Sequence, residues 1–127
     1  MPTHLLDTDI LIDFLRGRVE ARTLLASYEE RGDRPLISVV SVTELWAGSR
    51  PAEKSATAAL LSALGKIPVS EKIASLAGDF LCTYRRSHSV ELADALIAAT
   101  AADSSAILVT RNAKHYPMAA VKILKPY

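Results

Sequence analysis

The stretch that most constrains the fold runs from His4 to Gly17, with the sequence HLLDTDILIDFLRG. A short apolar pair leads directly into Asp7, and apolar residues then recur at helical spacing, at Ile10, Leu11, Phe14 and Leu15. Gly17 follows as a C-cap glycine. The pattern predicts a strand at about residues 4–7, a sharp turn, and a helix at about 9–17. Asp7 would then lie at the carboxyl end of a strand, where ligands bind in open α/β sheets.

The rest of the chain alternates between short apolar runs and helical segments. Two runs rich in β-branched residues, 36–40 and 106–110, predict buried strands. Weaker strands are expected at 121–124 and at 67–69, which Pro68 would confine to an edge. Helices are expected at 19–30, 44–48, 52–65, 70–86 and 90–103, with Ser70 as an N-cap and Gly65 as a helix end. This alternation predicts an α/β fold with one mostly parallel sheet of four to five strands, covered on both faces.

Length and composition bound the class of protein. The 127 residues form a single domain, 1–127, and a content of 50% hydrophobic residues is that of a globular chain. A net charge of +1 argues against a strongly basic nucleic-acid coat but allows a local basic patch. The single cysteine, Cys82, is expected in a helix core and permits no disulfide framework. Acids interrupt the first apolar run, so we expect no signal peptide and no membrane span, and a cytoplasmic location.

Asp94 is the only ionisable side chain between Glu91 and Asp103, in an otherwise apolar helical segment. A helix of this composition is expected to be largely buried, and an unpaired buried carboxylate is costly. A cation, an arginine or backbone amides would have to offset that cost. Alternatively, Asp94 interacts with the helix N-terminus or lies at its exposed rim. The sequence alone leaves both interpretations open.

Glu44 also has two interpretations. The spacing Ser41-x-x-Glu44 is that of a capping box, in which the Glu44 carboxylate accepts a hydrogen bond from the Ser41 amide. The second interpretation notes that this short helix would begin where an apolar strand ends. Glu44 would then lie at the same edge of the sheet as Asp7.

A third strand end is followed by Thr110-Arg111-Asn112, residues that suit either a site or a plain turn. Asp7, Glu44 and Asp94 together would form a cluster of hard oxygen ligands, which suits Mg²⁺ or Mn²⁺ and not zinc. The three histidines show no paired metal-ligand spacing.

Four blocks of the sequence resemble the PIN-domain ribonucleases and, within them, the VapC-type toxins of toxin–antitoxin pairs. The blocks read LLDTDILI at 5–12, SVTEL at 41–45, ADALIAATA at 93–101, and LVTRN at 108–112 followed by Lys114-His115-Tyr116. Each block is weak alone, but the four occur in the family's order and at its length. The resemblance covers nearly the whole chain and implies a three-layer α/β/α PIN-like domain.

The resemblance also implies the activity, which is metal-dependent, endonucleolytic cleavage of RNA. Asp7 and Asp94 would bind the Mg²⁺ or Mn²⁺ ion, and Glu44 would bind it too or orient the attacking water. Thr110 and Asn112 would position metal-bound water or substrate. Many PIN domains have a fourth acid where this chain has Asn112, which puts a second metal in doubt. Three further acids are near in sequence and none is assigned to the site: Asp9, Asp13 and Asp103.

Substrate and partner contacts are expected beside the acids. The candidate phosphate contacts are Arg16, Arg111 and Lys114, together with Arg18. Family members resembling this chain form homodimers and are silenced by a small antitoxin, whose tail lies in a groove and often sends an arginine into the acidic site. Leu45 and Trp46 would line such a groove or pack in the core.

Two other functions compete with this one. A receiver domain shares the acidic pair, Thr110 and a Lys125-Pro126 dipeptide, but Ser70 and Glu71 stand where it requires its phosphoacceptor aspartate. A PIN fold that binds RNA or protein without cutting would fit the change to Asn112. A nuclease cuts RNA only with metal, a receiver is phosphorylated by small phosphodonors, and a binding module does neither.

Overall fold

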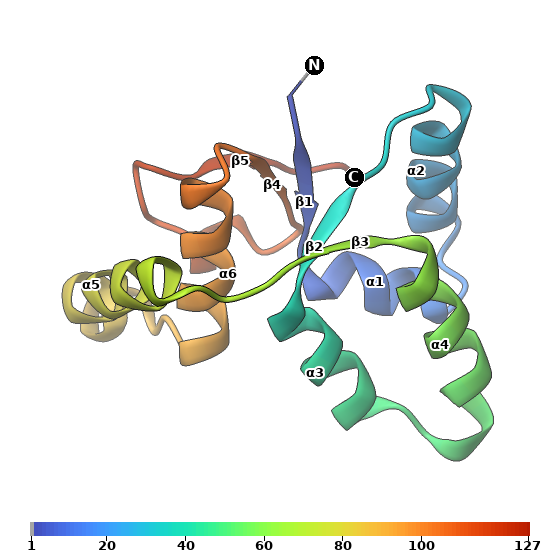
Figure 1. The fold of residues 1–127 in the computed structure, drawn as a ribbon, viewed down its shortest axis with the longest axis horizontal. Helices are drawn as coiled ribbons and strands as arrows, with labels where there is room; N and C mark the ends of the chain where they lie inside the picture. The colour runs from blue at the N-terminus through green and yellow to red at the C-terminus, as the bar shows by residue number, and fades with distance from the viewer. Residues whose placement is uncertain (1) are drawn as a thin grey trace.

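The computed structural model describes residues 2–127 and contains a five-stranded sheet between two groups of helices (Figure 1). The strands are β1 (His4–Leu6), β2 (Leu36–Ser38), β3 (Gly65–Ile67), β4 (Ile107–Val109) and β5 (Lys122–Leu124). They lie in the order β3-β2-β1-β4-β5, and every neighbouring pair is parallel. The predicted α/β fold is confirmed, and the strand that precedes Asp7 is the central one.

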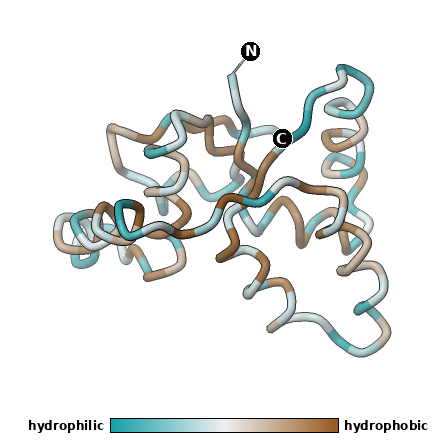
Figure 2. The backbone as a smooth tube through the Cα atoms, in the orientation of Figure 1, coloured by the Kyte–Doolittle hydropathy of each residue, from teal (hydrophilic) through white to brown (hydrophobic). Residues whose placement is uncertain are grey.

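The helices divide between the two faces of the sheet. One face packs against α1 (Thr8–Leu15), α2 (Val19–Glu30), α3 (Val39–Gly48) and α4 (Lys54–Ala63), and the other against α5 (Glu71–His88) and α6 (Leu92–Asp103). Successive side chains of a strand point to opposite faces of the sheet. Leu5 therefore packs with α5 and α6, whereas Leu6 packs with the other four helices. Figure 2 shows the hydrophobic residues concentrated in and around the strands.

The boundary between β2 and α3 differs from the prediction. The strand ends at Ser38 and the helix begins at Val39. The Ser38 hydroxyl accepts a hydrogen bond from the Val40 N–H at 3.1 Å and thereby caps the helix. Ser41 and Glu44 both lie inside α3, so the predicted capping box is wrong. Local β propensity at Val39 and Val40 gives way to the serine cap and to tertiary packing.

The segment predicted as one helix at 52–65 is also divided differently. A 3₁₀ turn (Pro51–Glu53) precedes α4, and Gly65 belongs to β3 instead of ending the helix. A Cβ atom at Gly65 would collide with the Leu36 side chain across the β2–β3 pair, so glycine allows this close approach. The strand expected at 67–69 lies instead at Gly65–Ile67 and ends before Pro68, but it is an edge strand as predicted.

The second half of the chain follows the prediction more closely. The Ser70 hydroxyl accepts a hydrogen bond from the Ile73 N–H at 3.1 Å and caps α5 as predicted. α6 begins at Leu92, two residues later than expected, and a 3₁₀ turn (Ala113–His115) lies between β4 and β5. Cys82 is exposed on α5, so its expected place in the core is wrong. Within residues 2–127, no helix is both long and apolar enough to cross a membrane.

Candidate active site

The site is built where β1 and β4 end side by side. Leu6 and Val109 are register partners in this parallel pair, so the residues that follow them meet at the carboxyl edge. The Asp7 N–H donates to the Val109 carbonyl at 2.9 Å, and the Thr110 hydroxyl donates to Asp7 Oδ2 at 2.8 Å. Both side chains are buried, with 6% of Asp7 and none of Thr110 exposed. Parallel adjacency thus brings together two residues 103 positions apart in the sequence.

Asp7 receives two more hydrogen bonds. The Thr8 N–H donates to its Oδ1 at 2.8 Å, and the Tyr116 hydroxyl donates to its Oδ2 at 2.9 Å. Burial nevertheless raises the pKa of Asp7 above its usual value, and the nearby negative charge of Asp94 acts in the same direction, against the hydrogen bonds. Tyr116 was matched in the sequence only as part of a family block, and nothing in its own surroundings indicated a contact with Asp7.

Glu44 is connected to Asp7 through Thr8. The Thr8 hydroxyl donates to Glu44 Oε1 at 2.7 Å, while the Thr8 N–H holds the Asp7 carboxylate. The Ser41 and Thr8 hydroxyl oxygens lie 2.8 Å apart, which ties α3 to the start of α1. Glu44 is an exposed residue on α3. The interpretation that places Glu44 at the same edge as Asp7 is therefore the one observed.

Asp94 lies in the first turn of α6. Its Oδ2 accepts a hydrogen bond from the Glu91 N–H at 3.2 Å, and 21% of its side chain is exposed. The alternative in which Asp94 interacts with the helix N-terminus is confirmed by this contact. His115 Nδ1 lies 3.7 Å from the same oxygen. Because the charge of Asp94 also raises the pKa values of Asp7 and Tyr116, these three side chains share one electrostatic environment.

Asp9, an acid that the sequence does not assign to the site, lies beside Asp7 and Thr110. Its Oδ2 accepts a hydrogen bond from the Arg111 N–H at 2.9 Å and lies 3.4 Å from the Thr110 hydroxyl oxygen. Its Oδ1 is buried and has no hydrogen-bond partner among the described residues. Burial, and then the charge of Asp7, raise the pKa of Asp9 to about 6.

Arg111 and Asn112 follow Thr110 in the loop after β4. The Asn112 N–H donates to the Thr110 hydroxyl oxygen at 3.0 Å. The Arg111 guanidinium forms a bidentate pair with Asp13, with Nε to Oδ2 at 2.5 Å and Nη2 to Oδ1 at 3.0 Å. The Arg111 charge is therefore already paired, and its predicted contact with RNA phosphate stays a prediction.

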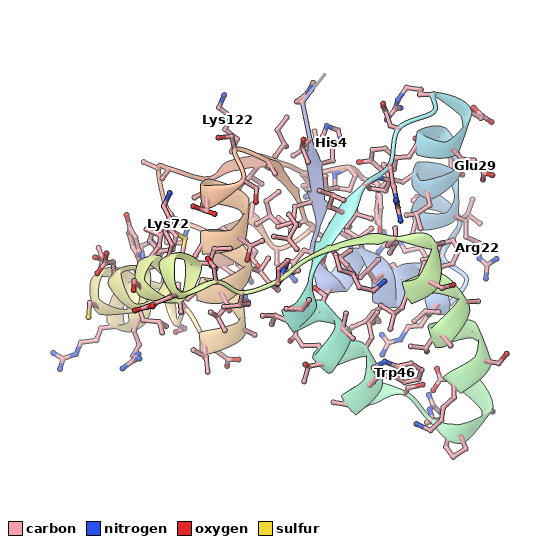
Figure 3. All side chains as sticks on the ribbon, viewed as in Figure 1. His4, Arg22, Glu29, Trp46, Lys72 and Lys122 are labelled. Atoms are coloured by element: carbon pink, nitrogen blue, oxygen red, sulfur yellow. The ribbon has the colours of Figure 1, made fainter. Side chains whose placement is uncertain are left out.

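The remaining candidates are two cations and two residues of α3. Arg16 and Lys114 are exposed. Arg16, Glu44 and Leu45 line a pocket of about 140 Å³ that also includes Arg50. Leu45 is 4% exposed and packs in the core, whereas Trp46 is 38% exposed on α3, with Lys54 Nζ 5.6 Å from its ring centroid (Figure 3).

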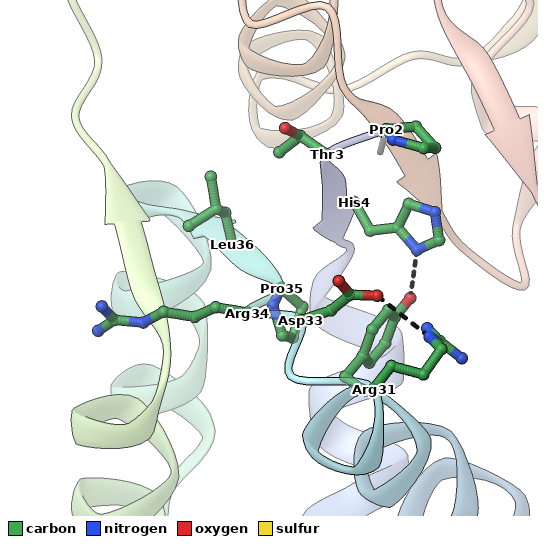
Figure 4. Close-up of a pocket in the computed structure, with 9 residues that line it drawn as sticks. Pro2, Thr3, His4, Arg31, Asp33, Arg34, Pro35 and Leu36 are labelled. Atoms are coloured by element: carbon green, nitrogen blue, oxygen red, sulfur yellow. Dashed lines mark hydrogen bonds and ion pairs between the residues drawn. The ribbon is translucent and has the colours of Figure 1, made fainter.

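A larger pocket, of about 490 Å³, lies at the opposite edge of the sheet (Figure 4). It is lined by His4, Tyr28 and Arg31, among others, around the start of β1 and β2. Its one carboxylate, Asp33, pairs with Arg31 at 3.1 Å. Since the acids that follow β1 are at the other end of that strand, this pocket is not part of the candidate active site.

The donor atoms at the carboxyl edge suit a hard divalent cation. Among residues 2–127, no three Asp, Glu, His or Cys side chains already lie close enough to hold an ion. The acid cluster nevertheless consists of four carboxylates at this edge: Asp7, Asp9, Glu44 and Asp94. It includes the Asp9 oxygen that has no partner among the described residues, and none of the four forms an ion pair with a lysine or arginine in the described chain. Oxygen donors that lack a cation are the ligand set that Mg²⁺ or Mn²⁺ prefers.

Comparison with known proteins identifies the family. The PIN domain model matches residues 4–121, nearly the whole chain. The chain belongs to the PIN domain family. Ribonuclease VapC10 of Mycobacterium tuberculosis is 48% identical over 116 residues, which cover 90% of this chain and 86% of the relative. Ribonuclease VapC19 of the same organism is 41% identical over 115 residues, with coverage of 90% and 92%.

Solved structures share the fold of this chain. A chain in a toxin–antitoxin complex from Klebsiella pneumoniae is 30% identical, with a TM-score of 0.78 over 98% of both chains. A chain of VapBC2 from Rickettsia felis, solved with a DNA fragment from the promoter, has a TM-score of 0.81 at 24% identity, covering 96% of this chain and 97% of that one. The predicted resemblance to VapC-type PIN domains is confirmed.

Proposed function

We propose that this protein is a metal-dependent endoribonuclease and the toxin of a VapBC-type pair. The observation that carries the proposal is the network at the carboxyl edge, in which Thr8 links Asp7 to Glu44 and the charge of Asp94 acts on Asp7. The 48% identity to Ribonuclease VapC10 supports RNA as the substrate. A phosphodiester is an anion, so a cluster of carboxylates needs a cation before it can accept one.

In this proposal Asp7 and Asp94 hold a Mg²⁺ or Mn²⁺ ion together with Glu44. The ion would supply a nucleophilic water near neutral pH and stabilise charge on the phosphate. Thr110 and Tyr116 fix the Asp7 carboxylate by donating to the same oxygen, Oδ2. Asn112 replaces a carboxylate with a neutral side chain, and its N–H orients the Thr110 hydroxyl. These residues therefore set the orientation of the carboxylate that is to bind the ion.

RNA binding would depend on exposed cations near the acids. Arg16 borders the small pocket that includes Glu44, and Lys114 is exposed in the turn after Asn112. Both are free to contact phosphate, and such contacts weaken as salt rises. The two side chains are the candidates for phosphate binding beside the cleavage site.

The antitoxin and the homodimer complete the proposal. The 30% identical chain from Klebsiella pneumoniae comes from a toxin–antitoxin complex, which supports an antitoxin partner for this chain. Exposed Trp46 and the pocket lined by Arg16, Glu44 and Leu45 offer an adjoining contact surface on α3. A second copy of the chain as a dimer partner rests on the family resemblance.

The test is cleavage of structured RNAs, including tRNA, by the purified protein with Mg²⁺, with Mn²⁺ or with EDTA. The variant is Asp94→Asn, and the matched control is Asp103→Asn at the other end of α6. Asp103 pairs with Lys72 at 3.1 Å and belongs to no contact of the acid cluster. We expect metal-dependent cleavage that the first variant loses and the second keeps.

Other outcomes would contradict the proposal. Cleavage that survives both EDTA and Asp94→Asn would indicate a contaminant or a mechanism without metal. RNA binding without cleavage under all conditions would favour a non-catalytic PIN module, the alternative that Asn112 suggested.

A further inference from the structure

We propose that Asp13 is a positioning residue that holds the Arg111 guanidinium away from Asp9 and so keeps the acid cluster open to a cation. The proposal rests on the metal-binding part of the proposed function. It assigns a role to the ion pair between buried Asp13 and half-buried Arg111, which the proposed reaction does not use.

The Asp13 carboxylate is contacted by three side chains, Arg111, Tyr127 and Arg18. It lies on α1, is 6% exposed, and accepts both Arg111 guanidinium bonds. The Tyr127 hydroxyl, in the segment after β5, donates to its Oδ2 at 2.7 Å. Arg18 Nη1 lies 3.6 Å from the same oxygen, and its guanidinium carbon is 4.7 Å from the centre of the Tyr127 ring. The Asp13 carboxylate is therefore held from several sides, in a position that binds the Arg111 guanidinium through two hydrogen bonds.

Arg111 contacts α1 at two points. Its backbone N–H donates to Asp9, and its guanidinium binds Asp13 one helical turn further along. Residues four apart on a helix lie on the same face, so the two carboxylates are neighbours. The backbone N–H of Arg111 is therefore bonded to Asp9, while its guanidinium is bonded to Asp13 and acts on Asp9 through its charge alone.

Because the Arg111 guanidinium binds Asp13 and not Asp9, the acid cluster keeps its negative charge. Arg111 is the residue directly after Thr110, and Thr110 itself binds Asp7. A guanidinium released from Asp13 would have Asp9 as its nearest alternative carboxylate on α1, with a buried oxygen that has no partner among the described residues. An arginine paired there would neutralise the cluster and compete with a divalent ion. Asp13 prevents this competition because it binds the Arg111 guanidinium through two hydrogen bonds.

The experiment measures Mn²⁺ binding directly, by the loss of the free-ion electron paramagnetic resonance signal. Asp13→Asn should weaken Mn²⁺ binding by about tenfold or more, in the range that supporting residues of metal ligands show. The double variant Asp13→Asn with Arg111→Gln should recover most of the affinity, because the competing cation is gone. A purely structural role for Asp13 predicts no recovery in the double variant.

Two further variants keep the test decisive. Tyr127→Phe removes one hydrogen bond to Asp13 but leaves the ion pair, so its Mn²⁺ affinity should stay within about twofold of the wild type. Arg111→Gln alone should bind Mn²⁺ at least as well as the wild type. A tenfold weaker affinity of Arg111→Gln would instead make Arg111 a necessary anchor of the site and would overturn the proposal, even if Asp13→Asn failed to fold.

A readout without metal or RNA separates this proposal from the proposed function. In nuclear magnetic resonance spectra of the metal-free protein, Asp13→Asn should give a contact between the Arg111 Hε and the Asp9 β-protons that the wild type lacks. Absence of that contact in the folded variant would refute the relocation of Arg111. If the wild type binds no Mn²⁺ while the contact appears, the metal dependence fails and the relocation stands.

Discussion

Asp9 and Asp13 lie one turn apart on α1, yet their surroundings are opposite. Burial and the charge of Asp7 raise the pKa of Asp9 to about 6, and one of its oxygens has no partner in the described chain. Burial would also raise the pKa of Asp13, but Tyr127, Arg111 and Arg18 outweigh it and lower the pKa below its usual value. One carboxylate is thus left in need of a cation and the other is fully paired.

The difference teaches that function and stability are divided along a single helix. The paired carboxylate joins α1 to the loop after β4 and to the segment after β5. The other carboxylate, Asp9, and Asp7 carry negative charge that no ion pair with a lysine or arginine in the described chain balances. A carboxylate without a cation is costly for the folded state, and such costs are concentrated at functional sites.

The largest expected effect is the loss of RNA cleavage when Asp7, a carboxylate without an ion pair, is replaced. Asp7→Asn should reduce RNA cleavage by at least about 100-fold, more than a residue that only supports a metal ligand would cause. Its free energy of unfolding in EDTA should change little, because the removal of a buried charge without a cation offsets the loss of one of the two oxygens that accept hydrogen bonds. Single-turnover cleavage and urea denaturation of the same preparation measure both quantities. A loss greater than the roughly 1.5–3 kcal/mol of one hydrogen bond to a charged group would show that the charge is satisfied within the protein.

The next effect is the loss of stability when Asp13, the carboxylate paired with Arg111, is replaced. Asp13→Asn should lower the free energy of unfolding by about 2–3 kcal/mol, since hydrogen bonds to charged groups contribute about 1.5–3 kcal/mol and Arg111 is only half-buried. Asp9→Asn is the matched control on the same helix and should cause no comparable loss. Urea denaturation of the two variants in EDTA provides the comparison. Equal losses would remove the distinction between the two carboxylates.

The smallest effect is on pH dependence. The folded protein keeps a proton on Asp9 up to about pH 6, whereas the unfolded chain releases it near 3.8. The free energy of unfolding should therefore fall as pH rises between these values, and Asp9→Asn should remove that component. Asp13 has the opposite sign: its stabilising contribution is present above pH 3.8 and is lost as pH falls through its lower folded-state pKa.

Denaturation of the metal-free wild type and both variants from pH 3 to 7 would measure these two components. We expect Asp9→Asn to change the slope above pH 4 and Asp13→Asn to change it below. The reverse assignment would contradict the described pairing.

The sequence was informative where the chemistry of the site follows from parallel strands. Asp7 and Thr110 each follow a buried apolar run, and adjacent parallel strands necessarily bring their ends together. The start of α3 was not predictable in the same way, because Val39 and Val40 favour a strand locally and the Ser38 cap decides the boundary.

Long-range side-chain pairing was the least predictable feature. Arg111 and Asp13 are 98 residues apart, and a basic residue in a loop beside a predicted site was interpreted as a phosphate contact. The sequence does not assign Asp9 to the site, because nothing near it in sequence shows that one of its oxygens is buried without a partner among the described residues. Tyr116 follows a short 3₁₀ turn, and only the path of the chain after β4 brings its hydroxyl to Asp7.

The most direct test of the account is a Mn²⁺ titration of the wild type, Asp94→Asn and Asp103→Asn. The two variants remove one carboxylate each from opposite ends of α6, and only Asp94 acts electrostatically on Asp7. We predict saturable binding to the wild type, at least tenfold weaker binding to Asp94→Asn and unchanged binding to Asp103→Asn. Equal binding to all three proteins would contradict the claim that the carboxylates at the carboxyl edge of the sheet hold a divalent ion.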